Sequence, residues 1–145
     1  MRPEPDNTLQ PWQRRTVVGA AWSLLLSGAL WLAIHHLWGA GAGGLPHPLE
    51  AWLMRWHGLS APAGLFALGI VAAGHVQGGW RLGLQRASGL ALCALGAALV
   101  ASGYALAYLV PEGWRPGVGW GHAAIGALAF GVGAAHARRR PAGIS

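Results

Sequence analysis

The chain carries little charge, and what it has comes from few residue types. Only 10% of its 145 residues are charged, whereas about a quarter is usual in soluble domains. Lysine is absent and only four residues are acidic. This composition argues against a soluble helical bundle and favours a membrane-embedded protein. The net charge of +6 does not indicate a nucleic-acid partner, because the arginines are scattered over short segments instead of forming one basic surface.

Cysteine is nearly absent as well. Cys93 is the only one, which excludes a disulfide within the chain and a cysteine-rich zinc site. We find neither a paired nucleophile and base nor a glycine-rich phosphate-binding loop. We therefore expect no reaction that side chains carry out by themselves, and we expect Cys93 to fill space between helices.

Long apolar runs are the main feature that is present. Four stretches of 20 or more residues contain no Asp, Glu or Lys, and a helix needs about 20 apolar residues to cross hydrocarbon. Arg55 is the one charged residue in them, near a span end where its side chain can reach the interface. The predicted spans are Thr16–Trp38, Leu53–Val76, Ser88–Val110 and Val118–Ala137.

Short connections between these spans predict an all-α, integral membrane four-helix bundle over residues 16–140. Residues 1–15 would be a polar cytoplasmic segment and residues 141–145 a tail. Arginine placement predicts that both termini are cytoplasmic, since arginines gather in cytoplasmic loops. Arg55 and Arg115 fall on the outer side of this arrangement. The inner side holds Arg2, Arg14, Arg15, Arg81, Arg86, Arg138, Arg139 and Arg140.

Histidines lie at whole-turn spacing on two of the spans. His57 and His75 are 18 residues apart, and His122 and His136 are 14 apart. At about 100° per residue, each pair projects from one face of its helix, near opposite ends. The second and fourth spans run in the same direction, so His57 lies at the level of His122 and His75 at the level of His136. Two facing imidazoles at each level predict two b-type haems.

The outer pair fits this prediction less well than the inner pair. At ~1.5 Å per residue, the histidines are separated by about 27 Å on the second span and about 21 Å on the fourth. Helix tilt absorbs part of the difference; otherwise His36 replaces His57. Only one of the adjacent His35 and His36 can face the interior; we choose His36, and the sequence does not exclude His35. We interpret His47 as part of a rigid extended approach to the second span.

Two other kinds of site fit less well. Structural zinc needs four ligands around one point, but these histidines divide into two levels ~20 Å apart. A proton relay normally contains acidic residues inside the membrane, and the predicted spans contain none.

The glycines on the last two spans and two of the arginines can each be interpreted in two ways. The glycine series on the last two spans indicates either close helix packing or room for a flat macrocycle. Arg55 and Arg86 either orient the chain in the membrane or pair with haem propionates. The glycines are Gly89, Gly96 and Gly103 on the third span, and Gly121, Gly126 and Gly131 on the fourth.

Several short segments together resemble the small bacterial four-helix cytochromes b. The resemblance extends to the cytochrome b561-like group and to the membrane cytochrome b subunits of hydrogenases and formate dehydrogenases, and it covers residues 17 to 140. The segments are His47-Pro48-Leu49-Glu50, Arg55-Trp56-His57-Gly58, Gly74-His75-Val76, Ser102-Gly103-Tyr104, Trp120-Gly121-His122 and His136.

The resemblance implies a multi-pass protein of the bacterial inner membrane that binds two b haems. It implies electron transfer between a quinone pool and a partner redox protein or larger membrane complex. The pair His122 and His136 matches the family best, whereas many relatives take their other ligands from both the first and second helices. The alternative is a haem-free accessory subunit of a membrane complex. A small transporter is disfavoured by the absence of acids within the spans.

Overall fold

The computed structural model describes residues 9–38, 45–83 and 85–138, and all regular structure in these residues is helical. The predicted tail 141–145, the loop glycines 39–44 and three of the inner arginines (Arg2, Arg139 and Arg140) lie outside the described residues. The elements are α1 (Pro11–Leu37), α2 (Pro48–Val71), the π-helix η1 (Ala72–Val76), α3 (Gln77–Leu82), α4 (Arg86–Tyr108), the 3-10 helix η2 (Glu112–Trp114) and α5 (Arg115–Arg138).

Four helices in the described residues are long and apolar enough to cross a membrane, as predicted. Helices α2, η1 and α3 follow one another as a single 35-residue helix. Each predicted span overlaps one of the four. They cover Pro11–Leu37, Pro48–Leu82, Arg86–Tyr108 and Glu112–Arg138.

Polar caps extend the first two helices beyond their apolar runs. Helices α1 and α2 each begin at a proline, five residues before the predicted span, and proline in the first turn loses no helical hydrogen bond. The Gln13 side chain accepts a hydrogen bond from the Gln10 amide at 2.9 Å. The Glu50 side chain accepts one from the His47 amide at 3.3 Å. The predicted polar segment 1–15 therefore includes the first turn of α1.

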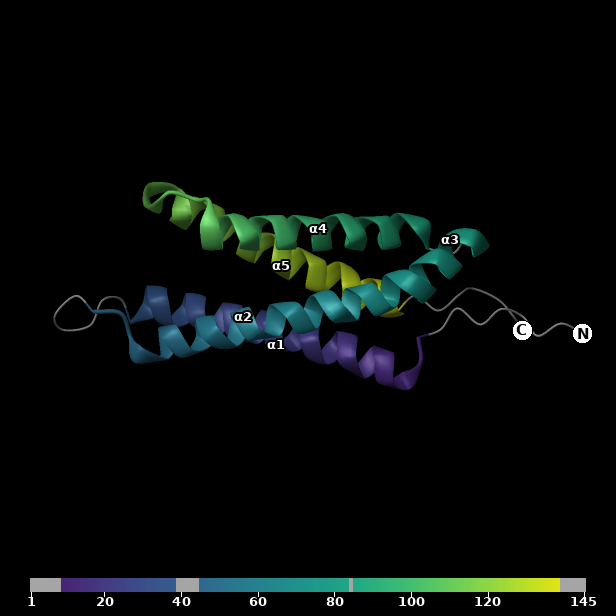
Figure 1. Cartoon of the computed structure of the whole chain (residues 1–145), viewed down its shortest axis with the longest axis horizontal. Coiled ribbons are helices and arrows are strands. Elements are labelled where there is room, and N and C mark those ends of the chain that lie inside the picture. Colours follow the sequence, from purple (N-terminus) through teal and green to yellow (C-terminus); the bar gives the residue numbers. More distant parts are fainter. Residues whose placement is uncertain (1–8, 39–44, 84, 139–145) are drawn as a thin grey trace, which may run out of the picture. The chain divides into compact units, whose positions relative to one another are not determined.

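The chain divides into two compact units, Met1–Gly78 and Gly79–Ser145. In the first, α1 packs along α2 as hairpin 1 (purple and blue-teal in Figure 1). In the second, α4 packs along α5 as hairpin 2 (green and yellow). Over the residues it describes, the structure thus confirms all-helical elements with paired neighbouring helices, and the four-helix bundle stays a prediction.

Small residues bring the two helices of hairpin 1 together. Gly64 and Ala67 on α2 are buried, and a Cβ atom at Gly64 would lie 3.0 Å from Leu24 Cδ1 on α1. Large apolar side chains such as Phe66 point outward instead, with 68% of its surface exposed. This combination of a small-residue seam and an apolar exterior is typical of helices in a bilayer.

Hairpin 2 has a looser seam. The Cβ positions of Gly126 and Gly133 on α5 lie 3.8 Å from leucine methyl groups of α4, which is ordinary van der Waals contact. No residue of α4 or α5 falls in the buried class within the part of the chain that the structure describes. The side chain of Cys93 is exposed on α4, so it does not fill space within hairpin 2.

Candidate functional site

His57 contacts a serine across the seam of hairpin 1. Its Nδ1 lies 2.9 Å from the Oγ of Ser27 on α1, and Ser27 is buried. The next residue, Gly28, leaves room for the imidazole, since a Cβ there would lie 3.3 Å from His57 Cε1. The predicted ligand His57 is therefore held at the helix seam by a hydroxyl and a glycine.

The same contact occurs twice in hairpin 2. His122 Nδ1 lies 2.8 Å from Ser102 Oγ, and His136 Nδ1 lies 2.8 Å from Ser88 Oγ. The two serines are 14 residues apart on α4, as the two histidines are on α5, so one antiparallel register accounts for both bonds. The prediction that His122 and His136 share a face of their helix is confirmed, because both contact α4.

In each of these three contacts the serine is followed directly by a glycine. The chain has three Ser-Gly pairs, at residues 27–28, 88–89 and 102–103, and each serine bonds a histidine of the following helix. A Cβ at Gly103 would lie 3.5 Å from His122 Cε1, while at Gly89 it would meet nothing within 4 Å among the described residues. The Ser-Gly pairs were visible in the sequence, but their serines were not predicted as partners of histidine.

A closed ring of hydrogen bonds lies beside His57. Trp56 Nε1 donates to Ser23 Oγ at 2.9 Å, and Ser60 Oγ donates to the Trp56 carbonyl at 2.8 Å. The two serine hydroxyls are 2.8 Å apart. Because the Ser60 proton goes to the carbonyl, Ser23 donates to Ser60, and every proton in the ring has an acceptor. The sequence had not indicated this ring.

His75 lies in the π-helix that follows α2. A π turn holds one residue more than an α turn, which rotates later residues by up to about 100° relative to a regular helix. The 18-residue count from His57 assumed a regular helix, so it does not place the two histidines on one face.

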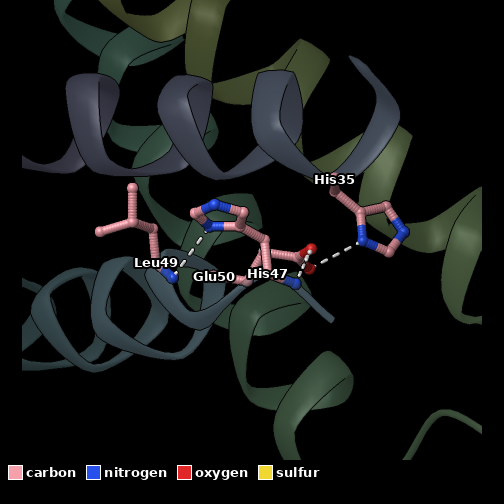
Figure 2. Close-up of polar contacts among 4 residues, drawn as sticks. All are labelled: His35, His47, Leu49 and Glu50. Carbon is pink, nitrogen blue, oxygen red and sulfur yellow. Dashed lines mark hydrogen bonds and ion pairs between the residues drawn. The ribbon is translucent and has the colours of Figure 1, made fainter. Parts of the chain in front are cut away.

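His35, the histidine that was not chosen at the end of α1, contacts α2. Its Nδ1 lies 2.9 Å from the Glu50 Oε2, as Figure 2 shows. Its ring stacks on Trp31 with centroids 4.7 Å apart, and the predicted candidate His36 lies edge-on against it at 5.1 Å. Both histidines are exposed.

His47 caps α2 in an extended conformation, in agreement with the prediction. Its Nδ1 accepts a hydrogen bond from the Leu49 amide at 3.2 Å, and Figure 2 shows the ring folded over this first turn. The imidazole thus accepts a hydrogen bond from one of the first amides of the helix, which have no partner within the helix.

The two predicted propionate partners each lie over a tryptophan. Arg55 lies 5.3 Å from the ring centroid of Trp52. Arg86 lies 5.5 Å from that of Trp80 and donates to the Trp80 carbonyl at 2.9 Å from its terminal nitrogen. Both guanidinium groups are exposed, which suits the membrane interface as well as an anionic group.

The predicted haem pairs join the two units. His57 and His75 belong to the first unit, and His122 and His136 to the second, so the pairing stays a prediction. No group of three His, Cys, Asp or Glu side chains that could hold a metal ion occurs among residues 9–38, 45–83 and 85–138. A haem with two axial imidazoles does not need such a group.

Comparison with known proteins adds no relative: no family model, no curated protein and no solved structure matches the chain.

Proposed function

We propose that the chain is an integral membrane cytochrome b that binds two b-type haems and carries electrons within the bilayer. His57 and His122 would serve the outer haem, and His75 and His136 the inner one. Redox chemistry would come from the haem iron. The protein would supply the imidazole ligands, the apolar surroundings that set the potential, and the orientation of the imidazole rings.

The recurrent Ser-Gly and histidine arrangement carries this proposal. Three of the four candidate ligands have their Nδ1 within 2.9 Å of a serine hydroxyl on the neighbouring helix. Histidines that bind metals almost always have the other ring nitrogen hydrogen-bonded in this way. If these histidines served only packing, we would not expect the same serine contact at three of them. The pairing of ligands between the units rests on the sequence argument alone.

The surroundings of these histidines also fit a membrane cytochrome. Four apolar helices and arginines gathered on one predicted side support a multi-pass protein of the bacterial inner membrane with both termini cytoplasmic. Arg55 and Arg86 would pair with propionates at the two surfaces. A quinone pool and a redox partner protein would be the sources and acceptors of electrons.

Haem content tests the proposal directly. The full chain, purified in detergent, is expected to hold about two b haems by the pyridine haemochrome assay, with redox-dependent α and Soret bands. The substitution His136→Ala should remove about one haem equivalent, whereas the control His47→Ala, at a helix cap, should keep both. Absence of b-type haem in the unsubstituted protein rejects the function, and full haem content in His136→Ala rejects the inner ligand.

A haem-free accessory subunit is the second candidate. The observation that favours it is the apolar exterior, on which side chains such as Trp52, Leu59 and Phe66 are mostly exposed and could pack against a larger membrane complex. Two results together would favour this candidate over the cytochrome. The purified native complex would show no haem bands, and the complex would fall apart when this chain is removed.

A further inference from the structure

The serine partners of the histidines have already used their only proton. Ser27 Oγ lies 2.6 Å from the Ser23 carbonyl oxygen, and Ser102 Oγ lies 2.7 Å from the Ala98 carbonyl oxygen. A carbonyl cannot donate, so the hydroxyl proton lies between the two oxygens. This back-bonding to the carbonyl four residues earlier is a usual conformation of serine in helices.

The third serine, Ser88, also contacts a backbone carbonyl, but that carbonyl lies three residues earlier instead of four. Ser88 Oγ donates to the Gln85 carbonyl at 3.1 Å while it lies 2.8 Å from His136 Nδ1. With their protons on the carbonyl oxygens, Ser27 and Ser102 are left to accept from the imidazole, and we assign Ser88 in the same way from its contact with the Gln85 carbonyl. On this assignment the proton of each histidine–serine bond comes from Nδ1.

This proton count assigns the tautomer of three rings. In neutral imidazole one nitrogen carries the proton and the other carries the lone pair. With Nδ1 protonated, the lone pair of His57, His122 and His136 lies on Nε2. The hydrogen bond made by one ring nitrogen decides which nitrogen binds a metal, and a wrong tautomer would present an N–H to the iron.

We propose that Ser27, Ser88 and Ser102 are positioning residues that fix the Nδ1–H tautomer of His57, His136 and His122, so that Nε2 is the ligating atom. The inference rests on the proposed function for the identity of the ligand, but the tautomer itself is a property of the protein without haem. Each serine would also raise the electron density on its ring by accepting a hydrogen bond from Nδ1–H, which would favour the oxidised state of a bound haem iron.

Ser102 offers the cleanest test, with its variants compared in two states of the full chain. In haem-free protein in detergent micelles, ring ¹⁵N resonances should show His122 with Nδ1 protonated. The substitution Ser102→Ala should reduce the ratio of the Nδ1–H to the Nε2–H tautomer about 3- to 10-fold, the equivalent of one net hydrogen bond. The substitution Ser102→Thr keeps the hydroxyl and should restore the ratio to within about twofold.

In haem-loaded protein, Ser102→Ala should shift the ratio of reduced to oxidised haem at a fixed solution potential about 3- to 10-fold toward reduced. Ser23→Ala is the control, because it removes hydrogen bonds at a seam without touching a histidine proton, and it should leave both ratios unchanged. An unchanged His122 tautomer in Ser102→Ala overturns the inference even if the variant is less stable. A wild-type protein without haem overturns the proposed function but leaves the tautomer result standing.

Discussion

Besides the bond between Ser27 and His57, hairpin 1 joins its helices through side chains that are not candidate ligands. In hairpin 2 the inter-helix hydrogen bonds described above both end on a histidine. In hairpin 1 the ring formed by Ser23, Trp56 and Ser60 and the tight approach at Gly64 hold α1 to α2. In hairpin 2, Ser88 and Ser102 bond the ligands themselves. Hairpin 1 therefore has seam contacts separate from the one that holds its candidate ligand, whereas in hairpin 2 the same described bonds serve both roles.

This difference predicts how each hairpin responds to substitution. Damage to the seam of hairpin 1 should lower stability while His57 keeps its serine. Damage to the serines of hairpin 2 should change stability and histidine orientation together, because the same bonds serve both.

The largest effect is expected from filling the seam of hairpin 1. In Gly64→Leu the new side chain would meet Leu24, which already lies 3.0 Å from the Cβ position, so the free energy of unfolding should fall by about 2–3 kcal/mol. Gly133→Leu in hairpin 2 starts from a 3.8 Å contact and should cost less than half as much. Thermal and denaturant unfolding in micelles measure both.

Gly69→Leu is the matched control on α2, because a Cβ there meets nothing within 4 Å among the described residues. Equal losses at positions 64 and 69 would contradict the description of Gly64 as the tight point of the seam.

A smaller effect on the free energy of unfolding is expected from Gly→Ala substitutions in the three Ser-Gly pairs, and it should differ among them. Alanine is favoured over glycine in a helix by about 1 kcal/mol, and this gain should appear in full for Gly89→Ala, where the Cβ has space. At Gly103 the Cβ lies 3.5 Å from His122, and at Gly28 it lies 3.3 Å from His57. The gain should therefore shrink at Gly103 and vanish or reverse at Gly28. Unfolding free energies that do not follow this order would show that the histidines move aside without cost.

The smallest effect concerns the contact at the end of hairpin 1. His35 and Glu50 are 2.9 Å apart, but the His35 side chain is 49% exposed, so solvent weakens the interaction. A double-mutant cycle with His35→Gln and Glu50→Gln should give a coupling energy of about 0.5 kcal/mol. A coupling of several kcal/mol would contradict the description of this contact as weakened by solvent.

Apolar run length predicted all four helices because crossing hydrocarbon requires long runs without charge. The same signal missed the polar first turns of α1 and α2, since caps such as Gln10 and His47 stabilise a helix through hydrogen bonds and not through apolarity. The 14-residue spacing of His122 and His136 translated directly into a shared face because α5 is regular. The count from His57 to His75 does not establish a shared face, because the π turn interrupts the regular period.

Contacts between helices were harder to predict than positions on one helix. Helical periodicity shows that His35 and His36 diverge by ~100°, but it does not say which of them meets Glu50, because that depends on the rotation of α1 against α2. The partner of His57 depends on the same rotation. The Ser-Gly pairs were the one available signal, since a small residue beside a hydroxyl allows a ring from the neighbouring helix to reach it.

In hairpin 2, the distance of each serine–histidine bond from the turn indicates the order in which the two bonds form. Ser102 and His122 are 20 residues apart along the chain, while Ser88 and His136 are 48 apart. Contacts with short loops cost less entropy to close and form earlier. We therefore expect hairpin 2 to close from its turn, with His122 meeting its serine before His136 does. A chain synthesised only as far as the middle of α5 would then already hold His122 beside Ser102.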